Sequence, residues 1–390
     1  MDKNRCSISI IIPVYRGLQY LPKLVACIEA CVEYIPGISL ELILSNDSPD
    51  EPLPNKIISS LISIRVLNTD QNRGIHDARV RGLQNSTGDY ILFLDQDDRI
   101  VPEYFHSQLY AICSADAVVC NALSGGRLRY NTDRPLYKAA DRKCMINEGC
   151  MILSPGQVLI RRTAIPRVWV ENLMHHNGAD DWLLWLCMHS AEKKFAINQD
   201  VLFIRDVHYH NASFDSLKMA ASEREAVEII ETRKQLKEEE RKVLKELLPE
   251  IQERRIKETE KFKRMFFLQN DWFSVMNKGE TIAGYLSKRQ VKKLAIYGYG
   301  YLGKTLLENL KKSNIVVSYV IDKNADYLEA GVKCCTLENA FEKVDAVIVA
   351  FMSDCRKMVD VEIGQKLDAK IFWLEDIVSD MAGCHLGEKM

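Results

Sequence analysis

The stretch from Tyr90 to Asp98 reads Tyr-Ile-Leu-Phe-Leu-Asp-Gln-Asp-Asp, an apolar run followed at once by three carboxylates within four residues. A short continuous apolar run is typical of a strand that is buried on both faces of a parallel sheet. Carboxylates at this density repel one another unless a cation lies among them, and Mg²⁺ or Mn²⁺ binds one or two carboxylates together with substrate phosphates. The stretch therefore predicts a strand that ends at a metal and diphosphate site. An acidic turn that caps a following helix is the alternative.

Strand and helix patterns alternate along the first hundred residues. The expected strands begin at Ser7, where Pro13 should stop the run, and continue with Leu40–Leu44, Ile62–Leu67 and Tyr90–Leu94, while helical spacing covers Leu18–Tyr34 and His76–Gln84. This alternation predicts an α/β fold with a mostly parallel sheet. Binding residues are then expected in the loops that follow the carboxyl ends of the strands.

Length and composition limit the class of protein. A chain of 390 residues with 47% hydrophobic content predicts two or three globular domains and excludes a disordered or fibrous protein. Its 52 Lys and Arg against 54 Asp and Glu leave a formal net charge of −2, which excludes a surface built to hold nucleic acid. The 12 cysteines include no C-x-x-C pair, so reduced thiols in a cytoplasmic protein are expected. The longest apolar runs are far shorter than the roughly 18 to 20 residues of a membrane-spanning helix, so the protein is expected to be soluble or peripheral to the inner membrane face.

Four motifs stand in one order at the predicted strand ends. They are Pro13-Val14-Tyr15, Asn46-Asp47-Ser48, Asn72-x-Gly74 with Arg79, and Asp95-x-Asp97-Asp98. In this order and context, residues 5–215 resemble the family 2 glycosyltransferases, which are inverting enzymes with a GT-A fold that use nucleotide-diphosphate sugars. The resemblance implies a Rossmann-like mixed sheet in this part of the chain.

The resemblance assigns the donor nucleotide to four of these residues. Tyr15 would stack on or border the base, Pro13 would shape that pocket, and Asp47 would hydrogen-bond the base or the ribose. Arg79 would face the base or the diphosphate, and its planar fork suits that role better than a lysine. In the alternative interpretation Tyr15 only packs, and Arg79 pairs with a neighbouring aspartate, Asp77 or Asp89.

The resemblance divides the metal site among the aspartates of the acidic motif. Asp98 would be a direct ligand of Mn²⁺ or Mg²⁺, Asp97 would lie near the ribose and the metal, and Asp95 would support the turn. The stretch from Phe203 to Ser213 resembles the closing segment of the family. Its two histidines, His208 and His210, are candidates to complete the metal site or are simply solvated.

A second carboxylate pair opens a predicted helix at Asn177-Gly-Ala-Asp180-Asp181-Trp182. This segment resembles the family motif E-D-x-x-L-W, whose aspartate is the general base, so Asp181 is the expected base and Asp180 stands in place of the family's glutamate. A positioned carboxylate suffices to take the proton of an acceptor hydroxyl. Capping of the helix by Asp180 or Asn177 is the alternative.

Residues 216–267 carry charged side chains at helical spacing with almost no Gly or Pro, which predicts two solvated helices joined at Leu248-Pro249. A helical spacer that packs along one apolar stripe is the preferred interpretation, and a basic face that meets lipid headgroups is the alternative.

The strand, turn and helix pattern returns after residue 292, with Gly298-x-Gly300-x-x-Gly303-Lys-Thr satisfying both a dinucleotide and a phosphate-loop motif. Asp322 ends the next apolar run, 24 residues after Gly298, which favours a Rossmann unit over a P-loop. The region resembles small Rossmann modules attached to bacterial sugar-modifying enzymes. Gly298, Gly300, Gly303 and Asp322 form its candidate nucleotide site. NAD(P) is the expected ligand if it binds one, although an empty or regulatory module is preferred.

The sequence thus predicts an α/β protein with a GT-A domain at 1–215, a charged helical linker at 216–285 and a Rossmann-like domain at 286–390. The predicted function is metal-dependent, inverting transfer of a sugar, with UDP as the expected nucleotide, to a glycan or lipid-linked acceptor in bacterial surface polysaccharide assembly. Two other functions stay open: an NAD(P)-dependent oxidoreductase acting through the C-terminal domain, and a non-catalytic scaffold that binds nucleotide sugar.

Overall fold

The computed structural model describes residues 6–35, 37–206, 215–340 and 343–383, and the chain divides into two compact units, Met1–Ile256 and Lys257–Met390. The strands of the N-terminal unit are β1 (Ser7–Val14), β2 (Ser39–Asn46), β3 (Ser63–Leu67), β4 (Tyr90–Phe93), β5 (Asp98–Ile100), β6 (Ala117–Ser124), β7 (Arg127–Leu128), β8 (Val158–Arg161) and β9 (Phe195–Arg205). Its helices are α1 (Leu21–Tyr34), α2 (Ile75–Gln84), α3 (Tyr104–Ile112), α4 (Tyr137–Ala140), α5 (Arg142–Asn147), α6 (Arg167–Glu171), α7 (Asp180–Ser190) and α8 (Ser216–Thr232), together with the first part of α9 (Glu238–Asn277).

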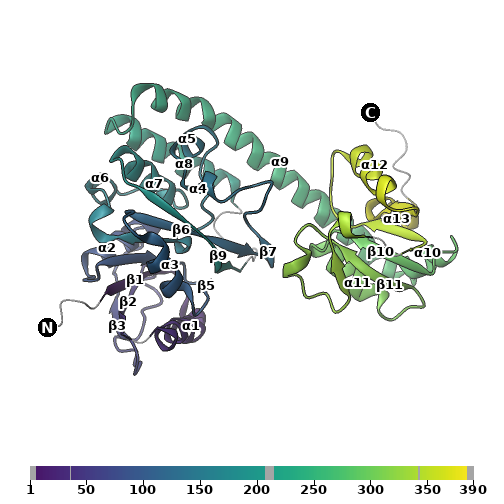
Figure 1. Ribbon diagram of the computed structural model, residues 1–390, viewed down its shortest axis with the longest axis horizontal. Helices are drawn as coiled ribbons and strands as arrows, with labels where there is room; N and C mark the ends of the chain where they lie inside the picture. The colour runs from purple at the N-terminus through teal and green to yellow at the C-terminus, as the bar shows by residue number, and fades with distance from the viewer. Residues whose placement is uncertain (1–5, 36, 207–214, 341–342, 384–390) are drawn as a thin grey trace. The chain divides into compact units, whose positions relative to one another are not determined.

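The sheet of the N-terminal unit is mixed, which confirms the predicted fold class. Its strands follow the order β3-β2-β1-β4-β8-β6-β9-β5, and β7 pairs with β6 (Figure 1). The first half, from β3 to β4, is parallel, whereas β8 runs antiparallel to both β4 and β6. The carboxyl ends of β1, β2 and β4 therefore meet at one edge of the sheet, where the predicted motifs follow them.

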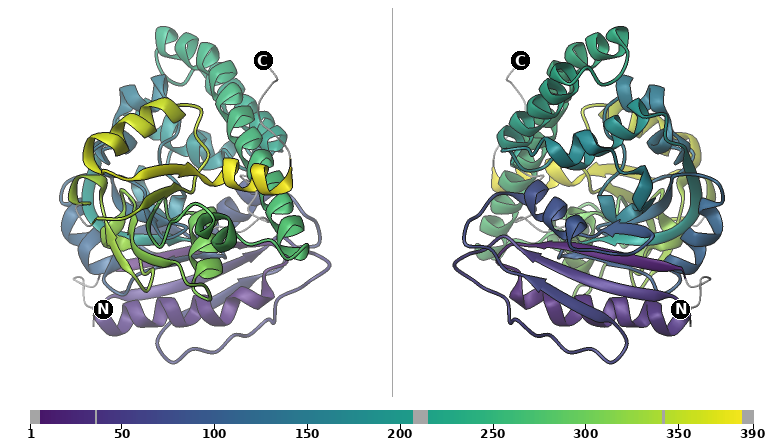
Figure 2. Two further views of the ribbon diagram at one scale, coloured as in Figure 1. Left: turned by 90° about the vertical axis from the view of Figure 1, so that its right-hand side faces the viewer. Right: turned by 90° about the vertical axis from the view of Figure 1, so that its left-hand side faces the viewer.

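Two hydrophobic cores cover the two faces of this sheet. Alternate residues of β1 point to opposite faces, so Ile10 and Ile12 pack with α1 and α3, while Ile11 packs with α2, α7 and α8. Figure 2 shows α1 running along one face of the sheet. Strands buried on both faces explain why these segments read as continuous apolar runs.

Pro13 does not stop the first strand, as the sequence suggested, because β1 continues to Val14. The backbone of Ile11 faces β4, since its carbonyl accepts the N–H of Leu94, and residues two apart face the same side. The position of Pro13 therefore faces β4 beyond Phe93, where that strand has ended. A backbone N–H at position 13 would find no acceptor on a neighbouring strand. The strand therefore tolerates a proline at this position.

The predicted helix junction at Leu248-Pro249 is wrong. Helix α8 ends at Thr232, and α9 then runs from Glu238 to Asn277 with Pro249 inside it. A proline within a helix costs one backbone hydrogen bond. Leu244, Leu247 and Ile251 on either side of it are buried in the core of the N-terminal unit, and this burial offsets the lost bond. The three-part division of the chain remains a prediction.

The C-terminal unit is a small parallel sheet with helices on both faces. Its elements are the last part of α9, α10 (Ile282–Ser287), β10 (Lys293–Tyr297), α11 (Tyr301–Leu310), β11 (Val316–Ile321), β12 (Lys333–Cys335), β13 (Ala346–Val349), α12 (Arg356–Lys366), β14 (Lys370–Trp373) and α13 (Leu374–Ala382). The strand order is β12-β11-β10-β13-β14, so the order reverses beside β10. This is the arrangement of a Rossmann-like fold, and it confirms the predicted class of this part of the chain.

Candidate active site

Asp47 follows β2 and fixes the loop before α2. Its Oδ1 accepts the backbone N–H of Arg73 at 2.9 Å, and its Oδ2 accepts that of Gly74 at 2.8 Å. Burial raises the pKa of the Asp47 carboxyl, while the two backbone N–H groups act in the opposite direction. Gly74 has a φ of +93°, a left-handed conformation that glycine adopts without strain. The residue predicted to bind the nucleotide therefore also holds the backbone of the N-x-G motif.

Tyr15 is joined to the acidic turn by its backbone. The side chain of Gln96 accepts the N–H of Tyr15 at 3.0 Å through Oε1 and donates to its carbonyl at 3.0 Å through Nε2. The ring of Tyr15 is 47% exposed, so it does not serve as a core residue and presents a face on which a base can stack. Gln96 thereby sets the position of Tyr15 relative to the acidic turn.

Asp98 is the most deeply buried carboxylate of the acidic motif. It is 4% exposed, and its Oδ2 accepts a hydrogen bond from the Ser154 hydroxyl at 2.9 Å. Burial, together with the charges of Asp95 and Asp97, raises the pKa of Asp98 well above its ordinary value. Asp98 begins the strand β5, so the alternative that this acidic turn caps a helix is wrong.

Arg79 joins the two acidic motifs. This guanidinium is buried, with its side chain only 4% exposed, and it donates to Asp95 Oδ1 at 2.5 Å and to Asp180 Oδ2 at 2.6 Å. The burial of the guanidinium and the charge of Asp180 act on its pKa in opposite directions, and the pKa is raised overall. Arg79 thus pairs with neither Asp77 nor Asp89, the partners of the alternative interpretation. It places the strand end of β4 and the start of α7 side by side.

Asp180 and Asp181 are the first two residues of α7, and neither carboxylate caps the helix. Helix α7 has no hydrogen bond from a capping side chain, so the alternative in which Asp180 or Asn177 caps it is wrong. Asn177 instead accepts the N–H of Ile75 at 2.9 Å, which ties the loop before α7 to the start of α2. Burial and the neighbouring Asp180 charge raise the pKa of Asp181 to about 7. A carboxylate with such a pKa accepts a proton near neutral pH.

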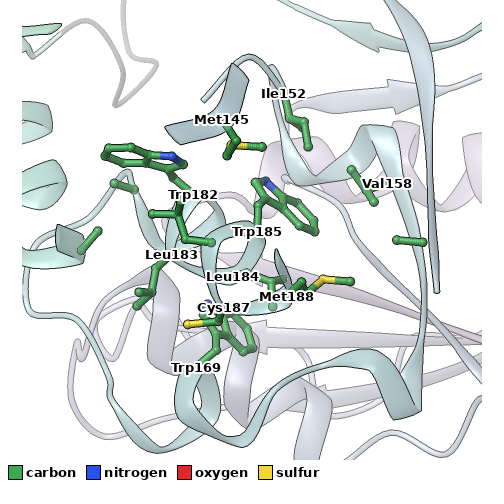
Figure 3. Close-up of a cluster of buried hydrophobic side chains, with 14 of the residues drawn as sticks. Met145, Ile152, Val158, Trp169, Trp182, Leu183, Leu184, Trp185, Cys187 and Met188 are labelled. Atoms are coloured by element: carbon green, nitrogen blue, oxygen red, sulfur yellow. The ribbon is translucent and has the colours of Figure 1, made fainter. Parts of the chain in front are cut away.

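Helix α7 is anchored by its apolar residues (Figure 3). Trp182, Leu183 and Trp185 are buried in one core together with Trp169 of α6. The indole Nε1 of Trp169 donates to the carbonyl of Asp180 at 2.8 Å. The packing fixes the first turn of α7, and with it the two carboxylates, relative to the sheet.

The segment from Cys150 to Ser154 relates to two of the candidate carboxylates, Asp98 and Asp181. At one end, Ser154 donates to Asp98. At the other end, the charge of Asp181 acts on the thiol of Cys150, whose pKa burial raises well above its ordinary value. We call residues 150–154 the connecting segment. No sequence signal predicted this segment, because none of its residues belongs to a motif. The only usable feature was Ser154-Pro155, a pair typical of the start of a helical turn.

The predicted metal ligands are consistent with a divalent ion. Asp97 and Asp98 offer hard oxygen ligands, and Mg²⁺ is commonly held by one or two carboxylates plus substrate phosphates. Within the part of the chain that the structure describes, no group of three or more His, Cys, Asp or Glu side chains is arranged to hold a metal. A metal would therefore take further ligands from a bound diphosphate. His208 and His210 lie outside the described residues.

The candidate site of the C-terminal unit is built differently. Asp322 accepts the backbone N–H of Tyr299 at 2.9 Å and that of Asn324 at 3.0 Å. A Cβ added at Gly298 would lie 2.5 Å from the ring of Phe351, and one added at Gly303 would lie 2.0 Å from the carbonyl oxygen of Gly298. The glycines thus permit close packing of the turn, the helix and Phe351. Gly300 lies just before α11 as its N-terminal flanking residue.

The comparisons with known proteins concern the N-terminal part of the chain. Residues 9–169 match the model of Glycosyl transferase family 2. A dolichol-phosphate mannosyltransferase of Pyrococcus furiosus is 23% identical over 165 residues, which are 41% of this chain and 42% of the relative. An uncharacterized glycosyltransferase of Haemophilus influenzae is 37% identical over 110 residues, 27% of this chain and 42% of the relative. The matched part thus spans less than half the length of these relatives. The crystal structure of S. aureus TarS 1-349 in complex with UDP-GlcNAc aligns with a TM-score of 0.44 at 15% identity, over 62% of this chain and 71% of that one.

The mixed sheet, with carboxylates at its strand ends, has the arrangement expected of an α/β domain of the GT-A type. Residues 9–169 of the N-terminal unit are thus similar to the glycosyltransferases of family 2. Among the described residues, no helix combines the length and the apolar character needed to span a bilayer.

Proposed function

We propose that the protein is an inverting, metal-dependent glycosyltransferase that moves a sugar from a nucleotide-diphosphate donor to a glycan or lipid-linked glycan. The observation that carries this proposal is the buried Arg79, which joins Asp95 of the strand-end motif to Asp180 beside the candidate base. A donor held at the first motif would then have its anomeric carbon close to Asp181. The family match and the mannosyltransferase relative support the same reaction class.

The donor nucleotide would bind where the strands β1 and β2 end. The exposed ring of Tyr15 offers a stacking surface for the base, and the Asp47 carboxylate lies at the end of the adjacent strand. Pro13 is buried within β1 and shapes the floor of that pocket through the backbone that precedes Tyr15. UDP is the expected nucleotide.

Asp97 and Asp98 would hold a divalent ion, and such an ion neutralises the charge that develops on a departing diphosphate. The raised pKa of Asp98 reflects first the burial of its carboxylate and then the charges of Asp95 and Asp97. An ion with two positive charges at this turn would relieve the repulsion among these carboxylates. Ser154 would keep Asp98 oriented toward the donor.

Asp181 would act as general base. An acceptor hydroxyl would lose its proton to the Asp181 carboxylate while its oxygen attacks the anomeric carbon, and the bond from that carbon to the diphosphate oxygen would break. The electron pair of the broken bond leaves with the nucleotide diphosphate. A single displacement of this kind inverts the configuration at the anomeric carbon. The raised pKa of Asp181 matches the proton acceptor that this step needs at neutral pH.

The biological setting is the assembly of bacterial surface polysaccharide at the cytoplasmic face of the membrane. A lipid-linked acceptor would bring a protein of this kind to the membrane as a peripheral enzyme. This part of the proposal rests on the resemblance of the sequence to its family alone, which is an argument by analogy.

The release of UDP from a panel of UDP-sugars tests the proposal, because water replaces an unknown acceptor in that assay. The wild type should release UDP from at least one donor in the presence of Mn²⁺. The variant Asp181→Asn should bind UDP as well as the wild type does and release about 100-fold less product, since it lacks the base. A wild type that binds UDP and turns over no donor would favour the scaffold instead.

A further inference from the structure

Gln96 lies inside the acidic motif, and its side chain extends the pairing of β1 with β4 beyond the ends of these strands. The pairing reaches Ile11 and Phe93, and the N–H of Leu94 still donates to the carbonyl of Ile11 at 3.0 Å. Residues two apart along a strand face the same side, so the backbone of Tyr15 faces the side of β4, as that of Ile11 does. There the carboxamide of Gln96 takes the place of a strand, because it accepts the N–H of Tyr15 and donates to its carbonyl, each at 3.0 Å.

Gly17 leaves room for this carboxamide. A Cβ added at Gly17 would lie 2.0 Å from Oε1 of Gln96 and 2.6 Å from its Cδ. The φ of Gly17 is −118°, which any residue adopts, so the backbone does not require glycine here. The requirement comes from the side chain of Gln96, which occupies the space that a Cβ would take. A side chain at position 17 would therefore push the carboxamide away from Tyr15.

Two further hydrogen bonds tie the turn after β1 to the loop after β2. The N–H of Asp47 donates to the carbonyl of Val14 at 2.7 Å, and the N–H of Arg16 donates to the hydroxyl of Ser48 at 2.6 Å. Tyr15 lies between these two contacts, so it is held beside Asp47 without help from the acidic turn. The two residues proposed to bind the base and the ribose thus form one half of the donor site.

The acidic turn is held by contacts of its own. Asp95 belongs to a buried ion pair, and Asp98 accepts the hydroxyl of Ser154 at 2.9 Å. Neither contact involves the turn after β1, so the carboxylates proposed for the metal and the diphosphate form the other half of the donor site. Gln96 lies between Asp95 and Asp98 in the chain, and its side chain bonds to the first half across 81 residues. It therefore fixes the separation of the two halves.

We propose that Gln96 is a positioning residue that sets the spacing between the base subsite at Tyr15 and the diphosphate subsite of the acidic turn. A nucleoside diphosphate joins its base and its phosphates by a short covalent link. It therefore gains from both subsites at once only when their spacing matches this link. Gln96 acts on the donor through Tyr15. This inference rests on the proposed function and adds a residue that determines how tightly the donor nucleotide is held.

Ligands that fill one subsite or both test this proposal on the full chain. Gln96→Met keeps most of the side-chain volume and removes both hydrogen bonds to Tyr15. UDP with Mg²⁺ fills both subsites and should bind this variant about tenfold more weakly than the wild type in calorimetry, because the two subsites are no longer held at the matching spacing. Uridine alone and pyrophosphate with Mg²⁺ each fill one subsite, so their affinities in NMR titrations should stay within about twofold of the wild-type values.

Gly17→Ala is the second variant, because it displaces the carboxamide of Gln96 and leaves its chemistry intact. It should weaken UDP binding as Gln96→Met does. In the background of Gln96→Ala it should have no further effect, since the clash at 2.0 Å is then absent. The matched control is Gln19→Met, which removes an exposed glutamine of the same turn that donates to the carbonyl of Arg16 at 3.2 Å. This control should bind UDP like the wild type.

Two results overturn the inference while the proposed function stands. UDP binding that is unchanged in Gln96→Met shows that the spacing does not depend on Gln96. A loss of uridine or pyrophosphate binding as large as the loss of UDP binding shows that one subsite is damaged and the spacing is not the cause. A wild type that does not bind UDP contradicts the proposed function itself, and the inference fails with it. The wild type thus decides the function, and the variants decide the inference.

Discussion

The two units of the chain both place an aspartate after the second strand of their sheet, yet the two aspartates have different surroundings. Asp47 and Asp322 each accept two backbone N–H groups of nearby loops. In the N-terminal unit a further carboxylate, Asp98, is buried with a raised pKa. In the C-terminal unit, Phe351 packs against Gly298 where a ligand would approach the turn. The same strand pattern is thus consistent with a charged site in one unit and an apolar contact in the other.

We infer from this comparison that an aspartate at a strand end does not by itself mark a nucleotide site. The mark is a raised pKa, which arises where a carboxylate is buried and other carboxylates lie nearby. Asp98 and Asp181 both have a raised pKa of this kind. The predictions below contrast the two units in order of their effect on UDP release.

The largest effect is expected from Asp98→Ala. Loss of the metal ligand should lower UDP release by about 1,000-fold, because charge stabilisation by a metal is worth several kcal/mol. The corresponding variant of the other unit, Asp322→Ala, should release UDP at the wild-type rate. Steady-state assays of both variants measure this contrast. Equal losses in the two variants would contradict it.

The second largest effect on UDP release is expected when the buried guanidinium of Arg79 is removed. Arg79→Met leaves Asp180 and Asp95 without their partner, and breaking a buried ion pair costs about 3 to 5 kcal/mol. We expect a lower free energy of unfolding in urea and at least about tenfold slower UDP release, because α7 loses its tie to the strand end.

The control for Arg79→Met is Arg356→Met in the C-terminal unit. Arg356 also bridges two carboxylates, Glu375 and Asp376, but its side chain is 31% exposed. An ion pair that is partly in solvent contributes less than about 1 kcal/mol, so this variant should be nearly neutral. A loss of stability as large as that of Arg79→Met would show that burial is not what separates the two sites.

The sequence predicted the strand-end motifs well, because each lies within a few residues of the strand that carries it. Asp98 was found in this way, whereas Asp181 was found from its resemblance to the family motif that opens a helix. The pairing of Arg79 with Asp180 could not be predicted, since 101 residues separate them and only the tertiary fold brings them together. Ser154 was missed for the same reason. Pro249 was misread as a helix break, because local preference does not record the burial of its neighbours.

The third effect is a pH dependence that belongs to the N-terminal unit alone. The pKa of Asp181 is raised to about 7, so UDP release per enzyme should rise with pH up to about 7 and then level off. Asp181→Asn should remove this rising limb. A profile with its midpoint near 4 would contradict the raised pKa.

The raised pKa of Asp181 also predicts how the stability of the protein depends on pH. Between the ordinary value near 4 and about 7, the folded protein binds the Asp181 proton more tightly than the unfolded chain does. The free energy of unfolding should therefore fall as the pH rises through this window. Above pH 7, Asp181→Asn should be more stable than the wild type, as measured by urea unfolding at pH 5 and pH 8. A difference that does not change with pH would contradict the assignment.

The smallest effect on activity is expected from Gly303→Ala. Its Cβ would lie 2.0 Å from the carbonyl oxygen of Gly298, so the turn and α11 must move apart. Overpacking of this kind costs about 1 to 3 kcal/mol, and the loss should be confined to the C-terminal unit. UDP release should stay at the wild-type rate. Hydrogen exchange resolved by peptide distinguishes a local loss from a global one, and slower UDP release would show that the two units are coupled.

Calorimetric titration of UDP and of NAD⁺ into the wild type, with and without Mn²⁺, tests the assignment of the site to the N-terminal unit most directly. We expect UDP to bind in a metal-dependent manner, and we expect Asp98→Ala to lose this binding while Asp322→Ala retains it. Binding of NAD⁺ alone, abolished by Asp322→Ala and unaffected by Asp98→Ala, would contradict the assignment and place the activity in the C-terminal unit.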